Sequence, residues 1–143
     1  MGSYIVQADL LADLPNDVLI QLTDDNKDGS ADSTVVTDAI TRAQSEVDGY
    51  LAKRYSVPIA SPPQLVKSLT ATITCYRLFG RRGRGVPDDW SKRYDNAVRT
   101  LRDIAAGTIA LDIEPPPAES SAATAGETSG PARVFDRDKL GSF

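Results

Sequence analysis

The sequence predicts an all-α fold: a small bundle of three main amphipathic helices, with short N-terminal helices before it and an extended C-terminal tail after it. Two observations lead to this prediction. Apolar residues recur at spacings of three and four along three segments, and prolines and glycines stand where each segment ends. Three amphipathic helices of this length bury their apolar stripes only against one another, so we expect one helical core.

Two short helical turns are predicted first, over residues 6–14 and 16–22, separated by Pro15. Their leucines are expected to cover one end of the core. The first main helix is predicted over residues 33–55, with Asp32 or Ser33 as its N-cap. Its stripe comprises Val36, Ala39, Ile40, Ala43, Val47, Tyr50 and Leu51. Residues 56–63 are Pro-rich and predict an extended connector.

The second main helix is expected to begin near Pro63, in its first turn, and to end at Gly80. One apolar side is predicted for it, made of Leu65, Val66, Leu69, Ile73, Tyr76 and Phe79. The third is predicted over residues 88–106, with Gly107 as its C-terminal cap. Residues 108–113 are β-prone, so a lone strand there would need a partner, for example from another chain.

The end of the chain divides into two further parts after a helical domain at residues 1–113. Residues 114–132 contain no aliphatic side chain larger than Ala and no aromatic, which predicts a flexible Pro/Ala/Ser linker. Residues 133–143 are again apolar and charged. Apolar anchors on a long tether are typical of a docking peptide, with these expected contact residues: Arg133, Val134, Phe135, Arg137, Leu140 and Phe143.

Several kinds of chemistry are disfavoured by composition. The 143 residues include no His and one Cys, so a His general base and the common Cys/His zinc sites are absent. Cys75 lies on a predicted apolar helix face, where core packing is its expected role. We therefore expect no enzyme, no cofactor and no bound metal. No apolar run approaches the ~18 residues of a membrane span, so we expect an intracellular protein without a membrane partner.

The net charge of -4 conceals a strong asymmetry along the chain. Residues 1–40 carry eight Asp and one Lys, a net charge of -7, whereas residues 41–107 carry twelve cations and six anions, a net charge of +6. Residues 108–143 have a net charge of -3. Such segregation is typical of an interaction surface, although it is equally compatible with solvated helix faces.

The loop at residues 24–32 matches the first half of an EF-hand calcium loop. Asp24, Asn26, Asp28 and Asp32 stand at loop positions 1, 3, 5 and 9, and a glycine stands at position 6. Position 12 is Val35 instead of the bidentate Glu. The simpler interpretation is a polar turn that caps the next helix, with calcium binding as the alternative.

A second charged loop contains Arg81, Arg82 and Arg84 among glycines. Three roles are open for it: non-specific contact with DNA phosphates, a salt bridge to the acidic N-terminal region of a neighbouring subunit, or a solvated loop. The low pI of about 4.8 and the lack of interleaved aromatics do not favour nucleic-acid binding.

A series of blocks along nearly the whole chain resembles the Mu-type phage head-tail connector proteins, also called adaptor or head-completion proteins. The blocks are Ile20-Gln21-Leu22-Thr23-Asp24, Glu46-Val47-Asp48-Gly49-Tyr50-Leu51, Tyr76-Arg77-Leu78, Arg93-Tyr94-Asp95-Asn96-Ala97 and Arg133-Val134-Phe135-Asp136-Arg137. No single block is diagnostic, but the set in this order is fairly specific.

This resemblance implies a structural virion protein of the neck, assembled in the host cytoplasm, with no catalytic residues and no required cofactor. It implies a dodecameric ring below the portal protein that extends the DNA exit channel and offers the tail-side connector or terminator protein a surface. Channel contact with genomic DNA would be non-specific. A calcium-responsive module and a DNA-binding module remain as alternatives.

Two hypotheses combine the resemblance with the residues. In the first, the acidic N-terminal region of one subunit meets the basic helical region of the next, because a ring needs two different complementary faces on each subunit. In the second, residues 133–143 dock on the portal or on a neighbouring subunit.

Overall fold

Five α-helices and one short 3-10 helix form the fold in the computed structural model, which describes residues 2–114. The helices are α1 (Gln7–Leu10), α2 (Asn16–Thr23), α3 (Ser33–Leu51), α4 (Gln64–Phe79) and α5 (Asp88–Ala106), with η1 (Arg81–Gly83) between the last two. Within residues 2–114 there is no strand, so the predicted all-α class is confirmed. None of the helices in this part of the chain is long and apolar enough to cross a membrane.

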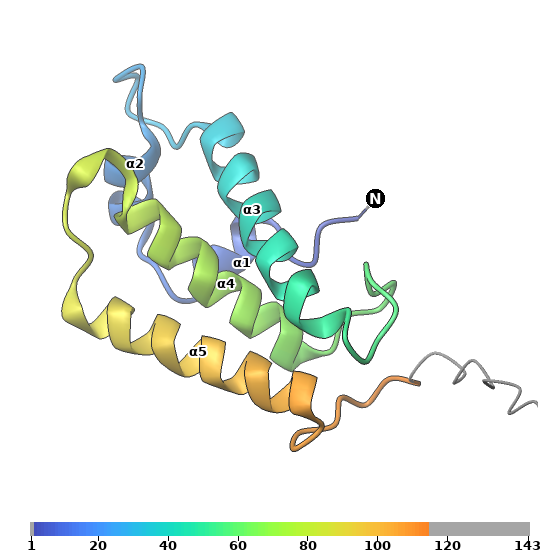
Figure 1. Cartoon of the computed structure of the whole chain (residues 1–143). Helices are drawn as coiled ribbons and strands as arrows, with labels where there is room; N and C mark the ends of the chain where they lie inside the picture. Colours follow the sequence, from blue (N-terminus) through green and yellow to red (C-terminus); the bar gives the residue numbers. More distant parts are fainter. Residues whose placement is uncertain (1, 115–143) are drawn as a thin grey trace, which may run out of the picture.

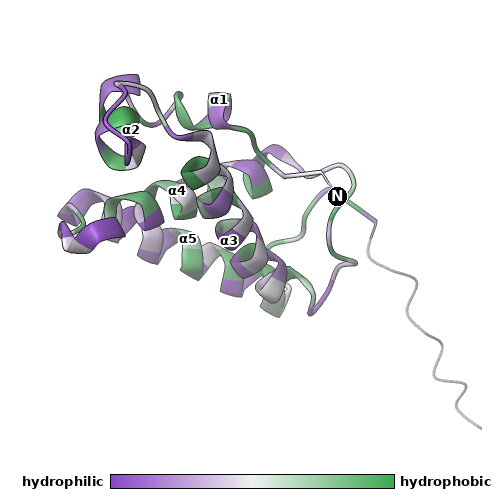
Figure 2. Ribbon diagram, turned by 90° about the horizontal axis from the view of Figure 1, so that it is seen from above, coloured by the Kyte–Doolittle hydropathy of each residue, from purple (hydrophilic) through white to green (hydrophobic). Residues whose placement is uncertain are grey.

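Helix α4 is the centre of the molecule. It packs against α3 and α5 along most of its length, and α1 and α2 also contact it. Figures 1 and 2 show α1 and α2 on one side of α4 and the α5 helix on the other. Hydrophobic and hydrophilic residues alternate along each of these helices (Figure 2). A helix surrounded in this way has little surface left for water.

The predicted one-sided stripe on α4 is correct only in part: Val66, Leu69 and Ile73 are buried, but the helix is buried on other sides as well. Leu65 is 38% exposed, whereas Leu78, which the stripe omits, is fully buried. Thr70 and Thr74 are also fully buried, on a helix that was expected to have a polar side. Each Thr hydroxyl donates a hydrogen bond to the carbonyl four residues earlier, so neither polar group is left unsatisfied in the core.

The boundaries of the main helices follow the sequence closely, with two differences. Asp32 is the N-cap of α3, and its carboxylate accepts a hydrogen bond from the Thr34 amide, as predicted. The helix ends at Leu51, four residues before the predicted end, because the chain turns there and places Tyr55 in the core. Pro63 is the N-cap of α4 and does not lie in its first turn.

Residues 108–113 do not form the predicted strand. The buried side chain of Leu111 packs into the core of its own chain, and its amide donates a hydrogen bond of 3.0 Å to the Tyr55 hydroxyl. Ile109 and Ile113 pack against the same cluster. The segment therefore closes the end of the bundle and needs no strand from another chain.

Gly107 caps α5, as predicted. Its φ of +88° lies in the left-handed region, and a Cβ at this position would stand 1.7 Å from Nη1 of Arg54. The Arg54 side chain, just after α3, therefore lies over the end of α5. The N-terminal segment is held similarly: the buried Tyr4 hydroxyl donates to Asp48 and accepts from the Ile59 amide. Burial and the Asp48 carboxylate raise the pKa of Tyr4 to about 12.

Candidate functional site

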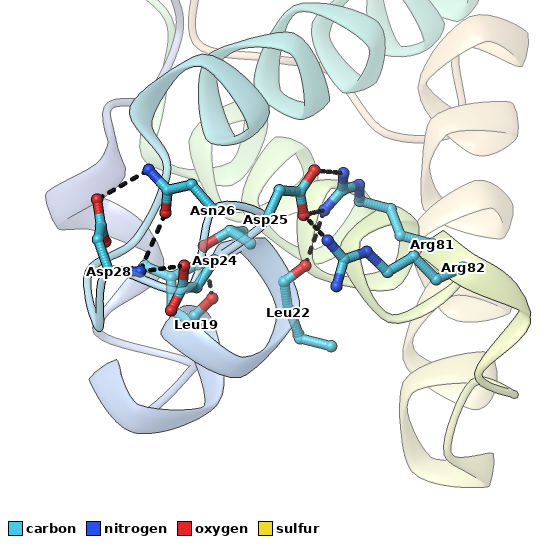
Figure 3. A network of polar contacts seen from close by, with 9 residues as sticks. Leu19, Leu22, Asp24, Asp25, Asn26, Asp28, Arg81 and Arg82 are labelled. Carbon is cyan, nitrogen blue, oxygen red and sulfur yellow. Dashed lines mark hydrogen bonds and ion pairs between the residues drawn. The ribbon is translucent and has the colours of Figure 1, made fainter.

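The arginine-rich turn after α4 contacts the acidic loop of the same chain. Helix α4 ends at Gly80, and η1 turns the backbone through Arg82, whose φ is +61°. Arg81 donates through Nη2 to Asp25 at 2.8 Å, and through Nη1 to the Leu22 carbonyl at the end of α2 at 2.9 Å. Arg82 donates to the other carboxylate oxygen of Asp25. Figure 3 shows both guanidinium groups directed at this one carboxylate. We call the contact of Arg81 and Arg82 with Asp25 the Asp25 clamp.

This arrangement revises the expected use of the arginines. Arg81 and Arg82 pair with Asp25 of their own chain, a contact that was not among the three roles left open for this loop: DNA, a neighbouring subunit or a solvated loop. Arg84 is exposed and has no ion pair among residues 2–114. Contact of Arg84 with DNA or with a neighbouring subunit stays a prediction.

We expect the Asp25 clamp to hold the acidic loop against α4 in a pH-dependent way. The hydrogen bond from Arg81 lowers the pKa of Asp25. A carboxyl whose folded-state pKa is lowered stabilises the fold above its unfolded-state pKa, and this contribution is lost as pH falls through the lower, folded-state pKa. The Asp25→Asn substitution should therefore speed amide hydrogen exchange in residues 24–32, measured by mass spectrometry at neutral pH.

Asp17→Asn is the matched control for this prediction, because Asp17 is exposed and has no ion pair among the described residues. Its exchange in residues 24–32 should equal that of the unchanged chain. Once rates are corrected for the pH dependence of intrinsic amide exchange, acidification should lower the protection of the loop in the unchanged chain toward that of Asp25→Asn. Equal protection of the loop in both variants would show that the clamp does not hold it.

The rest of the acidic loop is built from hydrogen bonds within itself. The Asp24 carboxylate accepts from the amide of Asp28 at 3.1 Å (Figure 3) and from that of Gly29 at 3.0 Å. Asp28 accepts from the Ser30 amide at 2.8 Å. The hydrogen bonds from Ser30 lower the pKa of Asp28. These contacts are those of a polar turn leading into the Asp32 cap of α3. Residues 2–114 hold no group of three or more Asp, Glu, Cys or His placed to ligate a metal ion.

Glu46 connects the three main helices. Its carboxylate on α3 accepts a hydrogen bond of 2.6 Å from Arg77 on α4 and another of 2.6 Å from the Tyr94 hydroxyl on α5. The Tyr94 ring stacks on Tyr76 with 4.1 Å between centroids. The hydrogen bond to Glu46 and burial raise the pKa of Tyr94 to about 12. In the sequence, Glu46 stood out only as the first residue of the Glu46–Leu51 block.

This connection accounts for the Glu46–Leu51 block noted in the sequence. Glu46 holds α4 and α5, Val47 and Leu51 are fully buried, and Asp48 accepts the hydrogen bond from Tyr4. The block is therefore a folding element. Cys75 is likewise in the core, as predicted, and burial raises the pKa of its thiol to about 12.

A groove of about 690 Å³ lies between α3 and the end of α4. The sequence gave no indication of it, because its walls come from three separate segments. Its lining residues are Thr34, Val35, Asp38, Ala39, Arg42, Tyr76, Arg77, Gly80, Arg81 and Val86. Arg81 thus belongs both to the Asp25 clamp and to the groove.

The predicted contact residues of the tail, Arg133, Val134, Phe135, Arg137, Leu140 and Phe143, lie outside the described residues, as do the predicted docking peptide and all of the linker except Glu114.

The fold and these contacts define a small helical protein in which polar side chains link the helices. Its surface carries an apolar groove and separate acidic and basic regions. The chain belongs to the family described as Bacteriophage Mu, Gp36, whose model matches residues 4–129. It is also 29% identical over 84 residues to the Mu-like prophage FluMu protein gp36 of Haemophilus influenzae. That match covers 59% of this chain and 57% of the relative. The predicted relation to Mu-type phage proteins is thereby confirmed.

Proposed function

We propose that the chain is a head-tail connector subunit that forms a ring below the portal, extends the DNA exit channel and provides the surface to which the tail attaches. The family match indicates a phage structural or morphogenetic protein. The resemblance to connector proteins, noted above, supports the finer assignment. The observation that carries the ring itself is the distribution of charges that have no ion-pair partner among residues 2–114.

The acidic side lies on the N-terminal turns. Asp9, Asp13 and Asp17 are exposed, and residues 2–26 contain no cation. The basic side lies on the last helix, α5, where Arg99 and Arg102 are exposed. None of these five side chains has an ion-pair partner among residues 2–114.

Two different, complementary charged faces are what a head-to-tail ring contact requires, because each subunit presents one face to each neighbour. Helices α1 and α2, which carry the acidic residues, lie on the opposite side of α4 from α5, which carries the basic ones (Figure 2). The pairing proposed between subunits thus involves Asp13 and Asp17 with Arg99 and Arg102. The Asp25 clamp is excluded from it, since its charges are already paired within the chain.

A structural role, without catalysis, is part of this proposal. The chain has no His, and its one thiol is fully buried with a raised pKa, so it supplies little thiolate at neutral pH.

Complementation of a phage lysate tests the proposed function. Cells infected with a phage that lacks this chain should accumulate DNA-filled heads and finished tails that do not join. Addition of the purified chain should restore infectious particles, whereas the variant Arg99→Glu/Arg102→Glu should not. A lysate that contains no heads, or in which heads and tails join without the chain, would contradict the connector role.

A further inference from the structure

We propose that the groove between α3 and α4 binds residues 133–143 of the same chain. The proposal does not rest on the connector function, because it concerns the chain alone, before any partner is present.

The groove is suited to an apolar peptide with charged neighbours. Its walls include the aliphatic side chains of Val35, Ala39 and Val86 and the ring of Tyr76. Its volume of about 690 Å³ lies within the range of ~300–1,000 Å³ typical of ligand sites, which combine apolar walls with a few polar groups. The side chains of such a site select a ligand by the charges at its rim.

The rim of the groove is rich in arginine. Arg42, Arg77 and Arg81 line it, and Asp38 is its one anion among the described residues. All three arginines pair within the chain: Arg42 with Asp38, Arg77 with Glu46 and Arg81 with Asp25. Arg77 donates one hydrogen bond, to Glu46, although a guanidinium carries five donor hydrogens. A carboxylate of a bound peptide would therefore accept hydrogen bonds from donors that the ion pairs leave unused.

The sequence of residues 133–143 provides that combination. Phe135 and Leu140 are apolar anchors of a size that the groove accommodates, and Asp136 and Asp138 stand between them. An aromatic next to an acid fits a site in which Tyr76 and three aliphatic side chains lie beside Arg77 and Arg81.

The length of the intervening chain matches the distance to be crossed. Val86, which lines the groove, comes just before α5, and residue 114 comes just after it. The 19 residues of α5 make it about 28 Å long. A linker with the length and composition of residues 114–132 has a root-mean-square span of about 24 Å if it follows the statistics of a flexible coil, and reaches at most ~65 Å. The effective concentration of the peptide at the groove is highest when the span of the linker matches the length of α5 that it must cross. This favours binding to the chain's own groove over binding to that of another copy.

Photo-crosslinking of the full chain tests this proposal. Phe135 is replaced by benzoylphenylalanine, and equal amounts of isotope-labelled and unlabelled chains are mixed and irradiated. Cross-links should map to peptides that contain Val35, Ala39 or Val86, and both partners of each cross-link should carry the same label. Cross-links to other surfaces, or between differently labelled chains, would overturn the proposal.

Two matched variants locate the site. Thr34 and Thr37 are both exposed on α3, but only Thr34 lines the groove. Thr34→Trp should obstruct the groove and lower the cross-link yield by about tenfold. This is the effect of a tenfold weaker affinity of the peptide for the groove when only a small fraction of the peptide is bound. Thr37→Trp should leave the yield unchanged. Circular dichroism verifies that both variants fold, and equal yields in the two would count against the groove as the site.

Discussion

Reversing the charges of Arg99 and Arg102 to Glu is expected to abolish ring formation. Both side chains are exposed on α5, and neither has an ion pair among residues 2–114, so the substitutions remove no contact described within the chain. In the proposed ring they face Asp13 and Asp17 of the neighbouring subunit. Like charges across an interface cost several kcal/mol, a loss of at least about 100-fold in affinity at each contact. When the variant chain is mixed with portal rings, it should therefore sediment as unassembled subunits in sedimentation velocity experiments.

Adding the opposite charge reversal at Asp13 and Asp17 should restore assembly. A chain that combines Arg99→Glu/Arg102→Glu with Asp13→Lys/Asp17→Lys again has complementary faces, with the signs exchanged. Lys53→Glu/Lys67→Glu is the matched control, since it changes the net charge equally at cations that do not lie on α5. Assembly should also weaken in roughly 1 M salt, where charges interact only within ~3 Å. Full assembly of the Arg99→Glu/Arg102→Glu variant at low salt would refute the electrostatic contact.

Truncation of Leu78 to Ala is expected to destabilise the fold severely, whereas the same change at Leu65 should have little effect. Leu78 is fully buried in a cluster to which all five α-helices contribute, and Leu65 is 38% exposed on the same helix. A buried Leu→Ala change costs about 2–5 kcal/mol, because it loses apolar contacts and leaves a cavity. That is a large part of the ~5–15 kcal/mol by which a domain is stable.

Thermal unfolding followed by circular dichroism measures this difference. Leu78→Ala should lower the unfolding midpoint by more than about 8 °C, and Leu65→Ala by no more than a few degrees. Similar midpoints for the two variants would contradict the burial of α4 on several sides. The comparison is sharp because residue type, helix and substitution are the same.

Most of the fold could be predicted because helix-forming signals are local. Spacings of three and four located α3, α4 and α5, and Asp32 and Gly107 marked a beginning and an end through cap chemistry that depends on neighbouring residues. The burial of Cys75 followed from the same spacing.

The failures have a common cause, which is that burial depends on the whole fold. Thr70 and Thr74 look polar in the sequence, but each hydroxyl is satisfied by its own helix, so α4 tolerates burial on several sides. Residues 108–113 have the composition of a strand, but burial of Leu111 against its own core determines their conformation. Local propensity is overridden when an apolar side chain finds a place in the core.

The candidate site was only partly predictable for a related reason. The two charged loops were recognised, but 56 residues separate Asp25 from Arg81, and nothing local indicates that they meet in one chain. Glu46 and the groove also depend on contacts between helices that are distant in sequence.

The mass of the complex that this chain forms with the portal protein of its phage tests the central proposal most directly. Native mass spectrometry or sedimentation at low salt should find a dodecameric ring of the chain bound to each portal ring, and no such complex with Arg99→Glu/Arg102→Glu. Portal rings and unassembled chain that remain separate under these conditions would contradict the assignment of this protein as a head-tail connector.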